Sequence, residues 1–143
     1  RIGIKVAADE SVRKVSDPLA VANAHAADVL VIKAQPLGGI RSALDITREA
    51  RLPVTVSSAL ETSVGISMGL HLAASLEVKS FDAGLGTVAL LADDVCDEPF
   101  IARDSMLDVM PAVPSEIKLA KLAADSERVD WWRARLERCY NLI

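Results

Sequence analysis

A chain of 143 residues with 51% hydrophobic and 25% charged side chains has the composition of a globular protein able to bury a core. The net charge of −4 offers no basic surface for nucleic acid, and no apolar run approaches the roughly 20 residues that span a bilayer. Cys96 and Cys139 match no metal or redox spacing, which favours ordinary thiols in a reducing compartment. The sequence therefore predicts a cytoplasmic protein without nucleic-acid or membrane partners.

Four short apolar runs, separated by helical patterns, predict an α/β fold. In chain order the predicted strands cover about 4–8, 29–33, 54–57 and 81–85. The first helix starts near Ser16, where a capping residue stands just before Pro18, and two further helices cover about 39–50 and 62–75. Regular alternation of strand and helix is typical of a parallel sheet.

The pattern changes after residue 86. The predicted elements are a short helix at 87–92, two short strands at 100–102 and 106–109, and terminal helices at 115–124 and 127–139. Trp131, Trp132 and Leu136 are expected to seat the last helix on a hydrophobic surface. We therefore expect two parts, a strand-and-helix region at 1–98 and a C-terminal irregular segment with two helices at 99–143.

Each predicted strand ends at a polar or glycine residue. Asp9, Lys33, Ser57 and Gly84 follow one another at steps of 24, 24 and 27 residues, about the length of one strand–helix unit. Parallel strands place their C-terminal ends on one rim, here called the mouth, where barrels and open α/β sheets carry their chemistry. Four units are half of an eight-unit barrel of about 250 residues. With a start at Arg1 rather than Met, the sequence looks like the C-terminal part of a longer chain.

Asp9 and Lys33 are the candidates for chemistry at the mouth. Asp9 suits an oxygen ligand of Mg²⁺, and it equally suits a cap for the following turn, so both interpretations stay open. Lys33 closes a run of apolar residues, and lysine is rarely buried unless it is paired. A functional cation is favoured there over a lysine whose ammonium reaches solvent past the strand end.

Small residues at the ends of the third and fourth strands could contact a ligand. Ser58 and Glu61 fit the capping-box pattern before an apolar helix, which gives them a structural role, whereas Ser57 is freer to face the mouth. Gly84 and Gly86 would let a ligand approach the backbone closely, although a plain strand-to-helix turn explains them equally well.

Taken together, four segments and the end of the chain resemble one known family. The segments are VAADES at 6–11, VIKAQPLGG at 31–39, VSSALETSVG at 56–65 and GLGT at 84–87, and the end runs from Trp131-Trp132 to Cys139-Tyr140. They resemble the C-terminal half of the o-succinylbenzoate synthases of actinobacterial type. This family belongs to the enolase superfamily, in its muconate-lactonising-enzyme-like branch.

The resemblance implies a fold and a reaction. The fold would be strands five to eight of a modified (β/α) TIM barrel, followed by a C-terminal segment that joins a capping domain. The reaction is an Mg²⁺-dependent dehydration in menaquinone biosynthesis, in which a proton α to a carboxylate is removed and an enediolate forms. By position, Asp9 matches a metal ligand and Lys33 the lysine that stabilises the enediolate. Positions that contact the substrate are matched by Ser57, Ser58, Gly84 and Gly86.

The sequence also departs from the family. Two further metal carboxylates and a Lys-x-Lys strand belong to a part that would precede Arg1, so we expect these 143 residues alone to be inactive. Within the superfamily, N-succinylamino acid racemase and muconate cycloisomerase-like activity are alternatives. A non-catalytic half-barrel that self-associates to cover its edge strands is a third interpretation, and an oligomer is expected whenever such edges are open.

Overall fold

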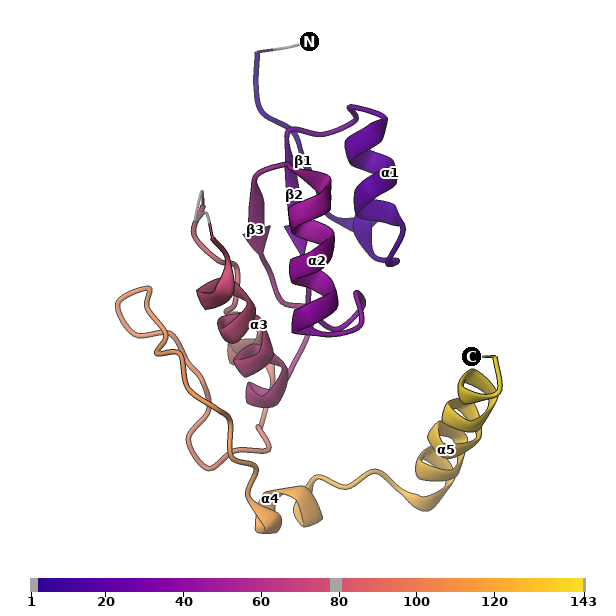
Figure 1. Ribbon diagram of the computed structural model, residues 1–143. Coiled ribbons are helices and arrows are strands. Elements are labelled where there is room, and N and C mark those ends of the chain that lie inside the picture. The colour runs from indigo at the N-terminus through magenta and orange to yellow at the C-terminus, as the bar shows by residue number, and fades with distance from the viewer. Residues whose placement is uncertain (1–2, 78–80, 143) are drawn as a thin grey trace.

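A computed structural model describes residues 3–77 and 81–142, and its centre is a parallel sheet (Figure 1). The strands β1 (Ala7–Ala8), β2 (Val29–Ile32) and β3 (Val54–Val56) lie in the order β1-β2-β3. Ala7 pairs with Val29, and Leu30 pairs with Val54. The α/β fold with parallel strands is thereby confirmed, although each strand is shorter than the range predicted for it.

Strand β2 is buried on both faces. Leu30 and Ile32 are completely buried on one face, and Val29 is 5% exposed on the other. A strand covered on both sides reads as a continuous apolar run rather than an alternating one, which is why the sequence signal was clear for β2. In β3, Val54 and Val56 are buried and Thr55 between them is partly exposed.

Three helices follow one another along the sheet in Figure 1, with α2 (Ile40–Ala50) between α1 (Asp17–Asn23) and α3 (Ser63–Ser75). Helix α2 buries Ala43, Ile46 and Ala50. It follows Gly39, whose φ of 104° suits glycine, and its C-cap Arg51 is left-handed. These helices agree with the predicted ones. They form the connections between successive parallel strands.

The predicted fourth strand at 81–85 is reduced to a single point of pairing. Ser57 and Gly84 form an isolated parallel bridge, in which the Gly84 N–H donates to Val56 O at 2.8 Å and the Ser58 N–H donates to Gly84 O at 3.0 Å. The strand was therefore predicted at the right place but with the wrong extent, because residues 81–83 are exposed and have a neighbour on one side only.

Beyond the bridge, the short helix η2 (Thr87–Leu90) confirms the helix predicted at 87–92. The strands predicted at 100–102 and 106–109 are wrong. In the described part of this region only isolated bridges form, between Cys96 and Pro114 and between Arg103 and Met106. Two helices close the chain, α4 (Glu116–Lys121) and α5 (Ser126–Tyr140).

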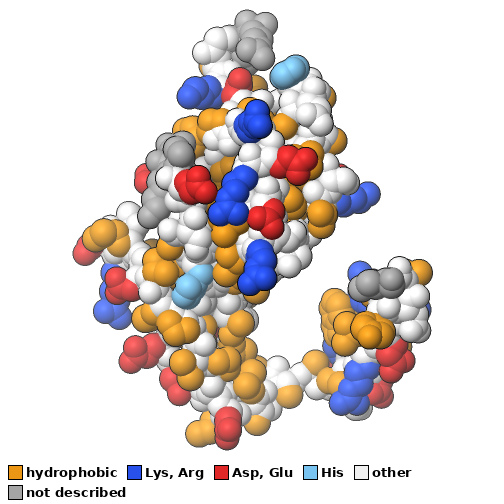
Figure 2. Space-filling model, viewed as in Figure 1, with side chains coloured by type: hydrophobic (Ala, Val, Ile, Leu, Met, Phe, Trp, Pro, Cys, Tyr) orange, Lys and Arg blue, Asp and Glu red, His pale blue; other side chains and the backbone are white. Residues whose placement is uncertain are grey.

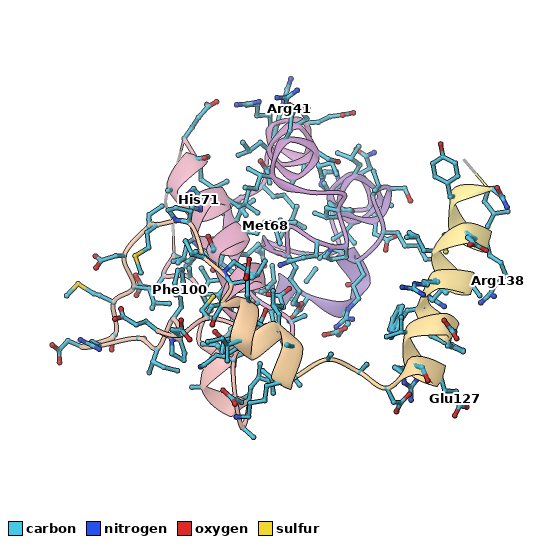
Figure 3. The ribbon with its side chains drawn as sticks, turned by 90° about the horizontal axis from the view of Figure 1, so that it is seen from below. Arg41, Met68, His71, Phe100, Glu127 and Arg138 are labelled. Atoms are coloured by element: carbon cyan, nitrogen blue, oxygen red, sulfur yellow. The ribbon has the colours of Figure 1, made fainter. Side chains whose placement is uncertain are left out.

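Among the described residues, none forms the hydrophobic surface expected to seat Trp131, Trp132 and Leu136 of helix α5. Figures 1 and 3 both show α5 standing apart from the sheet and its helices. Trp131 is 46% exposed and Trp132 is 55% exposed, and their rings contact each other edge to face. Figure 2 shows further hydrophobic side chains on the surface around α4. Among the described residues, no helix is long and apolar enough to cross a membrane.

Candidate functional site at the mouth of the sheet

The mouth brings Asp9 and Lys33 together. Asp9 follows β1, Lys33 follows β2, and the Lys33 ammonium forms an ion pair with Asp9 Oδ1. The Lys33 side chain is 7% exposed, so it does not reach into solvent past the strand end. Asp9 makes no side-chain cap for the turn η1 (Glu10–Val12), which removes the capping interpretation, and its side chain is 45% exposed. The result is a buried cation held by a carboxylate that solvent and ligands can reach.

Ser57 and Ser58 lie beside Gly84, on the other side of the mouth. The Ser58 hydroxyl is buried and donates to Gly84 O at 3.1 Å, while Ser57 Oγ stands 3.3 Å from the same oxygen. The capping box predicted for Ser58 and Glu61 is wrong, because α3 begins only at Ser63.

Gly84 and Gly86 are both exposed at this rim. A Cβ on Gly84 would stand 3.3 Å from Ser57 Oγ, whereas a Cβ on Gly86 would have no heavy atom within 4 Å. The two glycines therefore leave backbone accessible next to the Ser57 hydroxyl. Asp9, Lys33, Ser57 and Gly84 belong to one end of the sheet, as their spacing predicted.

Two residues at this rim were not predicted as site residues. Burial raises the pKa of Glu61, and the Ala59 backbone and the Lys33 charge partly oppose that rise. Glu61 therefore lies within the electrostatic reach of Lys33. Gln35 Nε2 donates to Gly65 O at 3.1 Å and so links the end of β2 to α3. The sequence did mark Glu61 through the capping-box pattern, but that pattern predicted a structural role at a helix start and not a place near Lys33.

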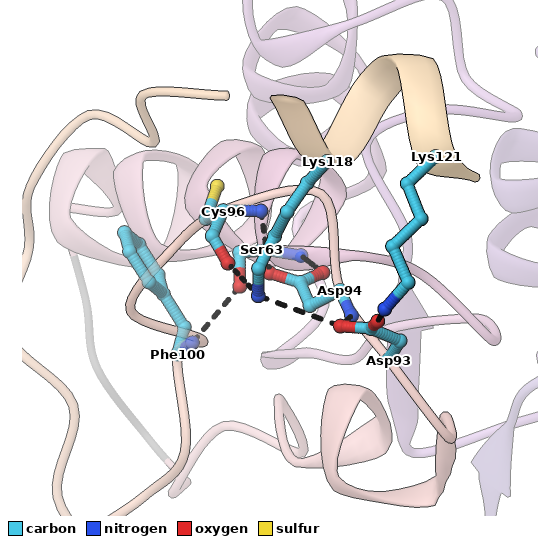
Figure 4. A network of polar contacts seen from close by, with 7 residues as sticks. All are labelled: Ser63, Asp93, Asp94, Cys96, Phe100, Lys118 and Lys121. Carbon is cyan, nitrogen blue, oxygen red and sulfur yellow. Dashed lines mark hydrogen bonds and ion pairs between the residues drawn. The ribbon is translucent and has the colours of Figure 1, made fainter. Parts of the chain in front are cut away.

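The start of α3 is capped by a residue 31 positions further along the chain. The Ser63 N–H donates to Asp94 Oδ1 at 2.9 Å, and Asp94 is 2% exposed (Figure 4). Burial by itself would raise the pKa of Asp94, but hydrogen bonds from Ser63 and from backbone N–H groups outweigh it and lower the pKa. No local pattern marks Asp94, since its partner lies in another element.

Asp9 is a suitable ligand for a hard divalent cation, since it offers an accessible carboxylate. The described residues contain no cluster of three or more His, Cys, Asp and Glu side chains that could hold a metal. Among the described residues, Asp9 is therefore a single candidate ligand, and these residues form no complete metal site.

Two concavities lie elsewhere. One of about 350 Å³ is lined by Arg51, Pro53 and Leu76, at the opposite end of β3 from the mouth. Another is lined by residues 3–6 and 25–28, before β1 and β2. Neither includes Asp9 or Lys33, so the ion pair at the mouth, and not the size of a cavity, marks the candidate site.

Parallel strands joined by helices, with polar side chains at the C-terminal ends of the strands, are the arrangement of part of an α/β barrel. Residues 1–114 match the family described as enolase C-terminal domain-like, and the chain belongs to that family.

Curated relatives within the family share about half of the residues of this chain. The chain is 49% identical over its whole length to an o-succinylbenzoate synthase of Mycolicibacterium smegmatis, of which it covers 44%. It is 48% identical over 95% of its length to an o-succinylbenzoate synthase of Thermobifida fusca, of which it covers 42%. The chain thus spans less than half the length of these curated relatives.

Solved structures agree on the fold. A muconate lactonizing enzyme from Pseudomonas putida superposes with a TM-score of 0.78 at 26% identity, over 87% of this chain and 37% of that one. A muconate lactonizing enzyme from Pseudomonas fluorescens, complexed with muconolactone, superposes with a TM-score of 0.74 at 30% identity, over 82% and 34%. The partial barrel predicted from the resemblance is confirmed.

Proposed function

We propose that this chain forms the C-terminal half of an o-succinylbenzoate synthase and contributes to its Mg²⁺-dependent dehydration in menaquinone biosynthesis. The observation that carries the proposal is the buried Lys33 ammonium, paired with an accessible carboxylate at the mouth. The similarity to two synthases, over 100% and 95% of this chain, supports the choice of reaction within the family.

The reaction requires positive charge next to the substrate carboxylate, because negative charge develops there when the proton is removed. A base removes the proton α to the substrate carboxylate, and the electron pair of the broken C–H bond moves into that carboxylate as an enediolate. The electrons then return, the carbon–oxygen bond breaks, and the departing hydroxide takes up a proton as water. Lys33 would stand opposite the base and stabilise the enediolate by its charge, which favours the transition state over the bound substrate.

Asp9 would be one ligand of the metal. When bound, Mg²⁺ supplies a second positive charge that neutralises the substrate carboxylate and its enediolate. The remaining carboxylates and the base would come from the part of the barrel outside this chain, as would the capping domain. In this proposal Asp9 has two tasks, since it also holds the Lys33 ammonium in place.

Ser57, Ser58, Gly84 and Gly86 would contact the small-molecule carboxylate substrate. Ser57 is suited to a direct hydrogen bond, because its contacts of 3.3 and 3.4 Å to carbonyl oxygens are long. Ser58 is buried with its hydroxyl bound to Gly84 O, so it would act by holding the rim against the substrate. The exposed backbone of the two glycines would allow close approach.

The superposition on muconate lactonizing enzymes favours a second candidate, a cycloisomerase-like activity on the same scaffold. Racemisation of N-succinylamino acids would use the same proton abstraction. For either enzyme we infer a cytoplasmic location, which would be checked by fractionation.

The test is an assay of the complete enzyme, in which these residues are joined to the rest of the barrel. We expect Mg²⁺-dependent formation of o-succinylbenzoate that Lys33→Ala abolishes and that Lys14→Ala, at an exposed lysine, leaves intact. Turnover of muconate or racemisation of an N-succinylamino acid at a higher kcat/KM would select the second candidate. No turnover of any of these substrates by the complete enzyme would refute the proposed function.

A further inference from the structure

The loop between β3 and α3 is fastened by one distant segment of the chain. This rim loop, residues 57–63, carries the two serines and Glu61. The fastening segment, residues 84–94, follows the bridge to β3. Three contacts join the two, at the beginning, near the beginning and at the end of the rim loop.

The first two contacts lie close together. The Ser58 hydroxyl and N–H both donate to Gly84 O, at 3.1 and 3.0 Å. The Thr87 hydroxyl lies 2.5 Å from Ala59 O and donates to it. These two contacts fix where the loop leaves the sheet.

The third contact is Asp94, and it fixes where the loop enters α3. Its Oδ1 accepts from the Ser63 N–H at 2.9 Å, and its Oδ2 accepts from the Cys96 N–H at 3.2 Å. The Ser63 hydroxyl in turn accepts from the Phe100 N–H at 2.9 Å. Ser63 is completely buried, and no side chain of the loop itself caps α3. A helix start that is buried without a partner would leave N–H groups unsatisfied, so Asp94 is the residue on which this end of the loop depends.

We propose that Asp94 is a positioning residue of the site, which sets the rim loop against Lys33 by holding Ser63 at the start of α3. The inference rests on the proposed function, because it takes the rim loop to be part of the substrate site. Asp94 does not touch the substrate and acts through Ser63. Its effect reaches the mouth because residues 58 and 63 are both held, which leaves the intervening residues little freedom.

The neighbouring Asp93 offers a matched control. It lies in the same segment but pairs with Lys121 at 2.9 Å and Lys118 at 3.4 Å, and so fastens α4 rather than the rim loop (Figure 4). Replacing Asp93 by Asn removes the charge that pairs with the two lysines and does not touch Ser63. The amide oxygen of asparagine can still accept from the Asp94 N–H, which donates to Asp93 Oδ1 at 2.9 Å.

The experiment compares Asp94→Ala, Asp94→Asn and Asp93→Asn in the complete enzyme, at a temperature where circular dichroism shows each to be folded. We expect kcat/KM to fall by about 10- to 100-fold in Asp94→Ala, since misplacement of a site by about 1 Å has effects of that size. Asp94→Asn keeps one acceptor and should fall less, while Asp93→Asn should keep the kcat/KM of the unmodified enzyme. Hydrogen exchange followed by mass spectrometry should show faster exchange of residues 57–63 in both Asp94 variants only.

A purely structural role would lower the melting temperature and leave kcat/KM of the folded enzyme unchanged, and that result would overturn the proposal. Equal losses in Asp93→Asn and Asp94→Asn would overturn it as well. If Asp94→Ala fails to fold, the comparison of the two asparagine variants decides. If the unmodified enzyme lacks dehydration activity, the proposed function fails, while unchanged exchange of the rim loop in Asp94→Asn would refute the positioning role independently.

Discussion

Replacing Lys33 by Met should make the complete enzyme more stable and nearly inactive. The Lys33 side chain is 7% exposed, so its ammonium has lost most of its hydration, whereas its partner Asp9 is 45% exposed and can be hydrated again when left alone. Burying such a cation costs several kcal/mol, and an ion pair with a partly exposed partner returns on the order of 1 kcal/mol.

Methionine has a similar length and no charge. We therefore expect Lys33→Met to raise the free energy of unfolding by about 1 kcal/mol, because the charge left behind on Asp9 is accessible to water and is not a buried, unpaired charge. At the same time kcat/KM should fall by about 100- to 1,000-fold, the loss typical when one group that stabilises an oxyanion is removed.

The assay is urea unfolding of the complete enzyme beside steady-state kinetics, with Lys14→Met as the exposed control. The comparison is valid where the dependence on urea concentration is equal in the variants. If Lys33→Met instead lowers the free energy of unfolding by more than about 2 kcal/mol, the lysine is retained for the fold, and the functional interpretation of its burial is wrong.

Three further results are expected. Gly69→Ala would place a Cβ 2.6 Å from Leu85 Cδ2, and it should lower the free energy of unfolding by about 1–3 kcal/mol. The control Gly86→Ala has open space around its Cβ and should leave the free energy of unfolding unchanged. Equal urea midpoints of the two variants would contradict this prediction. The hydrogen bond from Lys121 is the main cause that lowers the pKa of Asp93 from 3.8 to about 2. Because a lowered carboxylate pKa stabilises the fold above the unfolded value, that stabilisation should be lost as the pH falls from 3.8 through about 2, and melts of Asp93→Asn should differ from the unmodified protein only above this window. The isolated 143 residues should show no heat of Mg²⁺ binding by calorimetry and no o-succinylbenzoate absorbance; turnover by this chain alone would refute that.

The sequence predicted the parts of the fold that depend on local pattern. The apolar runs of β2 and β3 and the apolar faces of α2 and α3 were recognised from their spacing. The contact between Asp9 and Lys33 follows from parallel strands whose ends are evenly spaced in the sequence. Strand ends could be placed at one rim because the direction of a strand in a parallel sheet leaves no other choice.

The errors lie where a partner decides the structure. Phe81 is 44% exposed and Ile4 is 72% exposed, so apolar residues at the two outer strands did not extend the pairing when a neighbour was present on one side only. The capping pattern of Ser58 and Glu61 gave way to a buried carboxylate from a distant loop, and no short-range rule contains Asp94. Tertiary contacts of this kind override local preference.

The attachment of the rim loop at three places also determines the order in which its contacts can form while the chain is being synthesised. Residues 57–63 leave the ribosome before residues 84–94, so the nascent rim has no partner for the Ser63 N–H until Asp94 follows it. The Ser67 hydroxyl likewise waits for Met110 O, 43 positions later. Contacts of such sequence separation form late, because the chain between them must first be closed into a loop. The rim loop is thus completed after the sheet, and a chain that stops before residue 94 would lack the carboxylate that caps the start of α3.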